Sequence, residues 1–232
     1  MKRFLLFGLY GFIGLLVLSA LAFKIFQPVQ VVPRIRLAPG FSLTTQTDDQ
    51  LTNEDLRGQF VLYNFLYTRC PEPCNNLNDT MREIQSRLIE IELADIPIKF
   101  VTISFDPDYD TPEVLAAYAE VQDANPDQWI FATTTDLVKL KTIIGGSFEA
   151  YYEKQEDGTF TFDPKFVLVD GWGMIRGEYR YQTMTPDAER ILRHIGVMAE
   201  EVIKSQGAAT LAYEAAHYFL CYTCLLYTSP SP

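Results

Sequence analysis

Histidine and cysteine are scarce in this chain of 232 residues, which has two of the first and four of the second. Small secreted proteins that depend on a disulfide scaffold have more cysteines, spread along the chain, so that class is excluded. A structural zinc site is also not expected, because the sequence lacks two CxxC motifs that could act together and has no histidine pair at zinc spacing. The sequence further lacks a glycine-rich phosphate loop and a Ser-His-Asp signature.

Basic residues are in deficit as well, with 19 Lys and Arg against 30 Asp and Glu, for a formal net charge of −11. A protein that binds nucleic acid needs clustered positive charge to meet the phosphate backbone. We therefore expect no nucleic-acid partner. The hydrophobic share of 48% is enough for one ordinary domain with appendages.

The longest uncharged run of the chain lies at the N-terminus and extends from Phe4 to Phe23. As a helix it is long enough to span about 30 Å of hydrocarbon, and Lys2 and Arg3 before it would stay on the cytoplasmic side. Residues 1–23 are therefore predicted to be a single-pass transmembrane anchor with the following domain on the extracytoplasmic side. A cleaved signal peptide is the alternative, because Ala20-Leu21-Ala22 has the spacing of a cleavage site, and it places the domain on the same side.

Residues 24–40, with three prolines and little helical period, are predicted to be a linker, and residues 41–206 a single domain. Buried strands and amphipathic helices alternate along this domain. Strands are expected at 59–67, 98–105, 129–132, 166–169 and 174–181, and helices from the cysteines to about 91 and at 112–122, 135–144 and 186–204. Residues 170–173 have the composition of a hairpin turn. This order predicts an α/β fold, with a mixed central sheet flanked by helices.

Residues 207–232 are predicted to form one more helix, over 208–222, and a tail. The tail from Cys224, with the letters CLLYTSPSP, resembles the translated read-through of a sequencing adapter. The alternative is a short disordered terminus. Neither interpretation gives Cys224 a chemical role.

The chemistry of the chain is predicted to lie at Cys70 and Cys74, in the run TRCPEPC that follows a buried strand. Two cysteines four residues apart at the first turn of a helix are close enough for a disulfide or a shared metal. The positive helix N-terminus and Arg69 would favour the thiolate form. Paired thiolates are soft ligands that suit copper(I) or zinc, and copper(I) accepts two or three ligands. A purely structural disulfide is the simplest alternative.

Two motifs resemble the Sco/SenC family of membrane-anchored copper proteins: YTRCPEPC at 67–74 and FDPDYDTP at 105–112. The resemblance extends over about residues 41–204. It implies a thioredoxin-like fold and an N-terminal anchor. It also implies a role in delivering copper to cytochrome c oxidase or in reducing its copper-site cysteines. By resemblance, Cys70 and Cys74 would be the copper ligands.

The chain departs from the family pattern at three positions, with Asn75 in place of proline, Tyr109 in place of arginine and Phe162 in place of histidine. Phe162 stands eight residues before Asp170, where the resemblance places the third copper ligand. This leaves the third ligand unidentified.

Other side chains are weaker candidates for a metal site. His194 and His217 are expected to be packing or surface residues, and Asp163 and Met174 to have structural roles. Asp106 and Asp110 are interpreted as loop and helix-capping residues rather than as an acid–base pair.

Two functions remain open. In the first, the chain is a copper(I) metallochaperone for a cytochrome c oxidase copper-site subunit, and it holds copper(II) poorly because it lacks the histidine. In the second, it is an extracytoplasmic thiol:disulfide oxidoreductase, in which Cys70 attacks and Cys74 resolves, without stable copper binding. The sequence identifies neither the partner nor the direction of electron flow.

Overall fold

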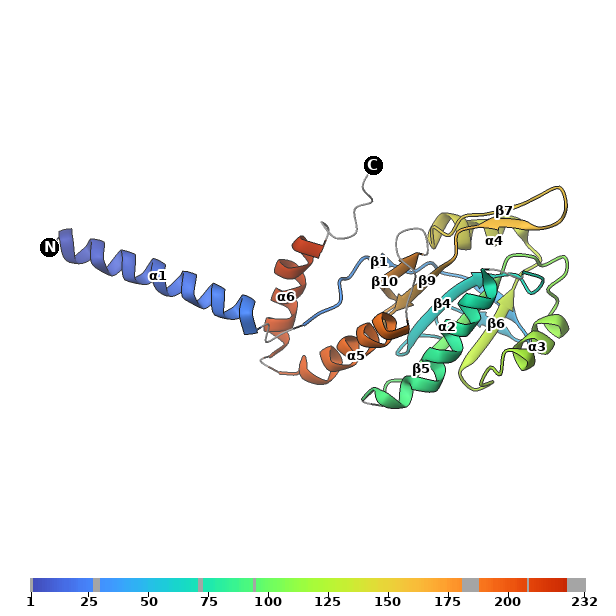
Figure 1. The fold of residues 1–232 in the computed structure, drawn as a ribbon, viewed down its shortest axis with the longest axis horizontal. Helices are drawn as coiled ribbons and strands as arrows, with labels where there is room; N and C mark the ends of the chain where they lie inside the picture. Colours follow the sequence, from blue (N-terminus) through green and yellow to red (C-terminus); the bar gives the residue numbers. More distant parts are fainter. Residues whose placement is uncertain are drawn as a thin grey trace.

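The computed structural model describes residues 2–26, 30–70, 73–93, 95–180, 188–207 and 209–224. Helix α1 projects from one end of an α/β domain, and helix α6 lies beside the point where they meet (Figure 1). Predictions about Pro71, Glu72, the residues 181–187 and the tail 225–232 lie outside the described residues.

A mixed eight-stranded sheet forms the centre of the domain, in the order β1-β10-β9-β4-β5-β6-β2-β3. Strands β4, β5 and β6 are parallel to one another, and the remaining neighbours are antiparallel. The strand bounds are β1 Arg36–Leu37, β2 Ser42–Thr45, β3 Gln50–Thr52, β4 Phe60–Leu66, β5 Ile98–Ser104, β6 Trp129–Thr133, β9 Lys165–Val169 and β10 Met174–Arg180. A separate antiparallel pair is formed by β7, Tyr152–Lys154, and β8, Phe160–Phe162.

Helices pack on both faces of the sheet (Figure 1). The bounds of all the α-helices described are α1 Lys2–Phe26, α2 Cys74–Arg87, α3 Pro112–Val121, α4 Leu137–Lys141, α5 Ala188–Lys204 and α6 Ala209–Cys224. The helix expected at 135–144 is shorter than predicted, because α4 passes into a π-helical segment, Thr142–Ser147, that contains the two glycines expected to end it. Its N-cap is Asp136, whose side chain accepts a hydrogen bond from the Lys139 amide.

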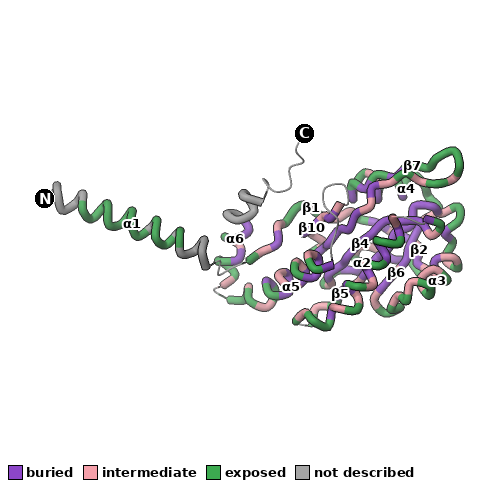
Figure 2. The backbone as a smooth tube through the Cα atoms, in the orientation of Figure 1, coloured by how far each residue is buried: buried purple, intermediate pink, exposed green. Residues whose placement is uncertain are grey.

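Strand β4 shows how the sequence divides the core between the two faces of the sheet. The side chains of Tyr63, Phe65 and Tyr67 are all buried in one cluster, as their alternation predicts. Phe60 and Leu62 point to the opposite face, where they pack with α2 and α5. The buried positions concentrate along the central strands (Figure 2).

The connections explain how the two ends of the sheet differ. Cys70 and Cys74 follow the C-terminal end of β4, and the loops after the parallel strands β5 and β6 lie at this same end. The turn at residues 170–173 joins β9 to β10 as a hairpin, as predicted, and lies at the opposite end, because Val169 pairs with Val61 at the start of β4.

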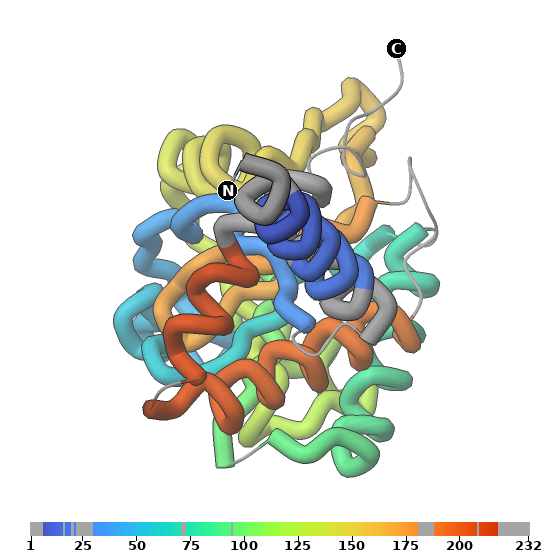
Figure 3. Tube along the Cα trace, turned by 90° about the vertical axis from the view of Figure 1, so that its left-hand side faces the viewer, coloured from blue at the N-terminus to red at the C-terminus, as the bar shows by residue number. Residues whose placement is uncertain are grey.

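Helix α1 and the linker belong to the hairpin end of the molecule. Figure 3, which looks from this side, shows α1 in front of the domain with α6 beside it. The side chains of α1 that the structure describes are exposed. Of the helices within the described residues, none combines the length and the apolar character required to cross a membrane.

Candidate functional site

The two cysteines meet in a disulfide at the N-terminus of α2. Their Cα atoms are 5.8 Å apart, and Cys74 is the first residue of the helix. Cys74 is fully buried, whereas Cys70 keeps 6% of its surface exposed. The Cys70 amide donates to the Tyr67 carbonyl oxygen at 3.2 Å, which holds the loop in a turn after β4. The structure therefore places both sulfur atoms at the positive end of a helix, with Cys70 nearer to solvent.

A buried carboxylate ties this loop to the neighbouring strand. Asp110, which has no exposed surface, accepts hydrogen bonds from the Thr68 amide at 3.0 Å and from the hydroxyl groups of Thr68 and Ser104. Burial raises the pKa of Asp110, while these hydrogen bonds act in the opposite direction. The helix-capping role expected of this motif belongs instead to Thr111, whose hydroxyl accepts from the Val114 amide, with Pro112 at the first helical position.

Arg69, next to Cys70, was expected to favour the thiolate form of that cysteine, but its guanidinium is engaged by other residues. Its guanidinium pairs with the buried carboxylate of Asp106, and lies 4.4 Å from the centre of the Tyr109 ring. The bond to Asp106 raises the pKa of Arg69. Its charge is thus largely met by Asp106 rather than by Cys70, and the family departure at Tyr109 supplies the ring on which it stacks.

Phe162 belongs to an aromatic cluster beside the cysteine loop. Its ring centre is 5.1 Å from that of Phe105 and 6.3 Å from that of Tyr67, and Phe160 packs against the same two rings. A cavity of about 320 Å³ adjoins this cluster, lined in part by Phe105, Phe160 and Tyr152. The position expected for a histidine ligand is therefore occupied by an apolar side chain packed among aromatic rings.

The remaining candidates do not complete a metal shell with the cysteines. Across the described ranges, no three or more His, Cys, Asp or Glu side chains are grouped to hold a metal ion. Met174 begins β10 at the hairpin end of the sheet, opposite the cysteines. Among the residues that the structure describes, the donor set at this site is two sulfur atoms, which fits copper(I) better than copper(II).

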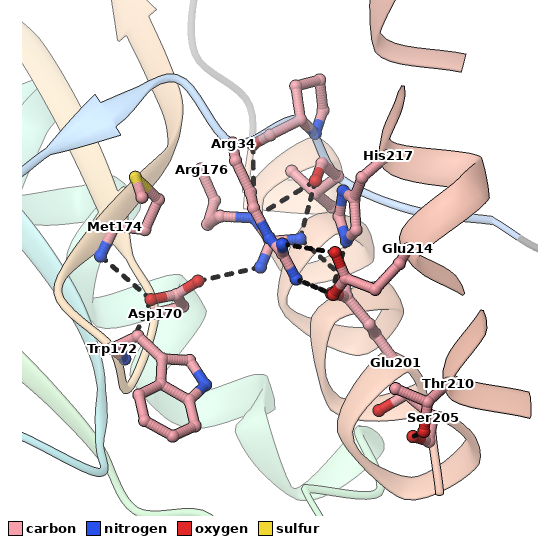
Figure 4. Close-up of polar contacts among 12 residues, drawn as sticks. Arg34, Asp170, Trp172, Met174, Arg176, Glu201, Ser205, Thr210, Glu214 and His217 are labelled. Atoms are coloured by element: carbon pink, nitrogen blue, oxygen red, sulfur yellow. Dashed lines mark hydrogen bonds and ion pairs between the residues drawn. The ribbon is translucent and has the colours of Figure 1, made fainter. Parts of the chain in front are cut away.

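Both histidines occupy packing positions. The Tyr179 hydroxyl lies 2.7 Å from Nδ1 of His194, and burial lowers the pKa of His194 to about 4. His217 is buried, with Nε2 2.7 Å from a carboxylate oxygen of Glu201 (Figure 4). That pair belongs to a polar cluster at the hairpin end, which sequence reasoning missed because its members lie far apart in the chain.

Comparison with known proteins identifies the fold and the class of the chain. The model of a family described as SCO1/SenC matches residues 31–199. The SCO1 protein homolog of Bacillus subtilis (strain 168) is 25% identical over 147 residues, which cover 63% of this chain and 75% of the relative.

Solved structures share the fold. A SCO1/SenC family lipoprotein from Bacillus anthracis is 26% identical, with a TM-score of 0.62 over 69% of this chain and 93% of that one. BsSco, a member of the Sco family of cytochrome c oxidase assembly proteins, superposes with a TM-score of 0.63 at 23% identity, over 74% and 98%. Arabidopsis thaliana ScoI with copper bound gives a TM-score of 0.61 at 21% identity, over 71% and 98%. The mixed sheet described above is therefore the thioredoxin-like Sco fold.

Proposed function

Because the chain belongs to the SCO1/SenC family, we propose that it carries copper(I) as cargo on Cys70 and Cys74 during cytochrome c oxidase assembly. The observation that supports this most is that the two sulfur atoms meet at the N-terminus of α2. Beside them, Phe162 occupies the position where the resemblance to the family places a histidine. Relatives of this fold are known with copper bound and as oxidase assembly proteins. Two thiolates suffice for copper(I).

Loading begins with reduction of the disulfide. Cleavage of the Cys70–Cys74 bond takes two electrons and two protons, which a dithiol of a partner protein supplies as it is itself oxidised. Copper(I) then replaces the two thiol protons. Transfer follows when thiolates of the acceptor displace Cys70 and Cys74 one after the other, so that copper never leaves sulfur.

The surroundings of the pair hold its geometry while this happens. Asp110 fixes Thr68 at the start of the loop, and α2 fixes Cys74 inside the domain. Cys70, the more exposed sulfur, is then the one that an acceptor reaches first. The partner in this proposal is the copper-site subunit of cytochrome c oxidase.

We place the domain on the extracytoplasmic side of a membrane. The uncharged run Phe4–Phe23 lies within the 25-residue helix α1, and Lys2 and Arg3 precede it. A similar protein from Bacillus anthracis is described as a SCO1/SenC family lipoprotein. In this proposal residues 1–23 are the anchor, 24–40 the linker and 41–206 the functional domain.

A second function, thiol:disulfide exchange without stable copper binding, is favoured by the disulfide itself. In this scheme the Cys70 thiolate attacks a partner disulfide, and one partner sulfur leaves as a thiolate. Cys74 then attacks Cys70 in the mixed disulfide, which restores the Cys70–Cys74 bond and releases a reduced partner. The pairing of Arg69 with Asp106 leaves the helix N-terminus as the main local support for the Cys70 thiolate.

One pair of measurements on the reduced chain separates the two functions. The chain is titrated with copper(I) against a competing chelator, and its disulfide potential is measured in glutathione buffers. The metallochaperone function predicts tight binding of one copper(I) that is lost in Cys70→Ser and Cys74→Ser. Negligible copper(I) affinity, with a potential near those of redox-active thioredoxin-like proteins, would refute it and support the exchange reaction.

A further inference from the structure

A single exposed tryptophan marks the end of the sheet opposite the cysteines. Trp172 occupies the β9–β10 turn with 84% of its surface exposed, and its indole takes part in none of the polar contacts drawn around Asp170 and Arg176 (Figure 4). Arg57 donates to the Trp172 carbonyl oxygen, which fixes the backbone of the turn. The turn is thus an ordered feature that holds a large aromatic ring in solvent.

The linker is fastened to this same end by a buried arginine. The guanidinium of Arg176 donates to the carbonyl oxygens of Val32 at 2.7 Å and Pro33 at 3.2 Å. The Ala38 amide donates to the carbonyl oxygen of Gly173, inside the turn, at 2.8 Å. The chain that leads from α1 into the domain is therefore bound beside Trp172.

Buried carboxylates hold Arg176 in place. Asp170 lies 2.9 Å and Glu201 2.6 Å from its nitrogen atoms, and all three side chains are buried (Figure 4). Two residues of helix α6 complete the cluster. Glu214 accepts a hydrogen bond from Arg34, and Nε2 of His217 lies 2.7 Å from a carboxylate oxygen of Glu201. With partners on β10, α5 and α6, the linker cannot swing freely about this end.

The reach of the chain limits how far this end can lie from α1. Helix α1 ends at Phe26 and the described linker resumes at residue 30, so the four intervening Cα steps span at most about 14 Å. Figure 1 shows α1 leaving the domain at this end, with the start of α2 on the far side.

We propose that the Trp172 turn rests in the interface of the membrane and that the cysteine pair faces away from it. This rests on the proposed anchor. The occupant of the surface is the lipid headgroup region, where an indole buries its ring and keeps its N–H hydrated. The seven residues of β4 set the cysteines about 20 Å further from the bilayer, so the copper acceptor must present its site at that height.

Tryptophan fluorescence tests the proposal, because the chain has only Trp129 and Trp172 and the first is fully buried. The full-length chain is reconstituted into phosphatidylcholine vesicles with a quencher-labelled lipid whose label lies near the headgroup. Emission of the wild type minus that of Trp172→Phe gives the Trp172 signal. We expect the quencher-labelled lipid to reduce the emission of Trp172 by a severalfold larger fraction than the emission of Trp129.

A matched control places a tryptophan at the other end of the domain. Val138, in α4, is 78% exposed and follows β6 on the cysteine side of the sheet. In a Trp172→Phe background, the indole introduced by Val138→Trp should be quenched no more than Trp129. Quenching of this introduced indole equal to that of Trp172, or no quenching of Trp172, overturns the proposal.

A chain that fails to enter the vesicles overturns this proposal as well. Copper(I) affinity is measured without a membrane, so either failure here leaves the proposed binding of copper(I) by Cys70 and Cys74 standing. If Trp172 is quenched but the chain does not bind copper(I), the proposed function fails and the placement of the Trp172 turn at the membrane stands.

Discussion

Phe162 is the residue that separates this site from a three-ligand copper centre. It packs against Phe105 and Tyr67 beside the cysteine loop, on a short strand whose Phe160 shares the same face. The resemblance to the family places the imidazole of its third copper ligand at this position.

Phe162→His is therefore expected to create copper(II) binding. A third ligand that adds only about 1.4 kcal/mol raises the affinity about tenfold, and the gain here should be at least that. Copper(II) titration, followed by sulfur-to-copper charge-transfer absorption, measures the effect. Thr161→His, on the exposed face of the same strand, is the control and should bind as the wild type does. If both variants behave alike, the position of the third ligand has been misplaced.

Asp106 is expected to influence the redox potential through Arg69. In Asp106→Asn the buried negative charge is lost and Arg69 is released, and both changes stabilise a thiolate at Cys70. These changes stabilise the reduced form of the cysteine pair relative to the disulfide, so the disulfide potential should rise by on the order of 10–30 mV. Equilibration with glutathione measures the shift. Asp108→Asn is the control, since Asp108 is exposed and pairs with Lys154, and an equal shift there would contradict the mechanism.

At the scale of elements, helix α5 is held to the sheet through a neutral histidine. Burial lowers the pKa of His194 to about 4 from 6.5, and its Nδ1 shares a hydrogen bond of 2.7 Å with the Tyr179 hydroxyl. The unfolded chain binds the proton more readily than the folded one. This part of the stability is thus present above pH 6.5 and is lost as the pH falls toward 4.

His194→Gln should remove this acid sensitivity. The loss between the two pH values is expected to be roughly 2 kcal/mol in the wild type, after allowing for the partly exposed ring. Urea unfolding at several pH values between 4 and 7, compared for the two proteins, isolates the histidine from the carboxylates that titrate in both. Parallel curves would show that His194 does not carry the effect.

Prediction from sequence succeeded for elements whose signal is local. The alternation in β4, the apolar stripe of α2 and the Thr111-Pro112 start of α3 each lie within one segment. The short strands β1, β2, β3, β7 and β8 were missed, because two to four residues show little period and their pairing partners are elsewhere. The same limit applies to the site. Asp110 contacts Thr68 across 42 residues of sequence, so its motif was visible whereas its partner was not.

At the scale of the whole molecule, Arg176 joins the linker, the sheet and the two C-terminal helices. Arg176→Gln would leave Asp170 and Glu201 as buried charges with reduced compensation, at a cost of about 3–5 kcal/mol. Urea unfolding measures the loss, and hydrogen exchange should rise at residues 30–38. Arg82→Gln, an exposed pair with Asp79, should change stability by less than about 0.5 kcal/mol. Equal losses in the two variants would deny Arg176 this role.

The same contacts give the two ends of the molecule different roles. One end carries α1, the linker and Trp172, and the other carries Cys70 and Cys74 with the aromatic cluster around Phe162. In the proposed function, this arrangement would present the copper(I) cargo away from the bilayer, toward an acceptor on the same membrane.

The central claim is that two thiolates alone hold the copper. X-ray absorption of the copper(I)-loaded full chain tests it most directly, in a Cys221→Ser, Cys224→Ser background that leaves only Cys70 and Cys74. The account predicts a copper(I) edge and a first shell of two sulfur atoms. A nitrogen scatterer with the outer-shell pattern of imidazole would contradict it.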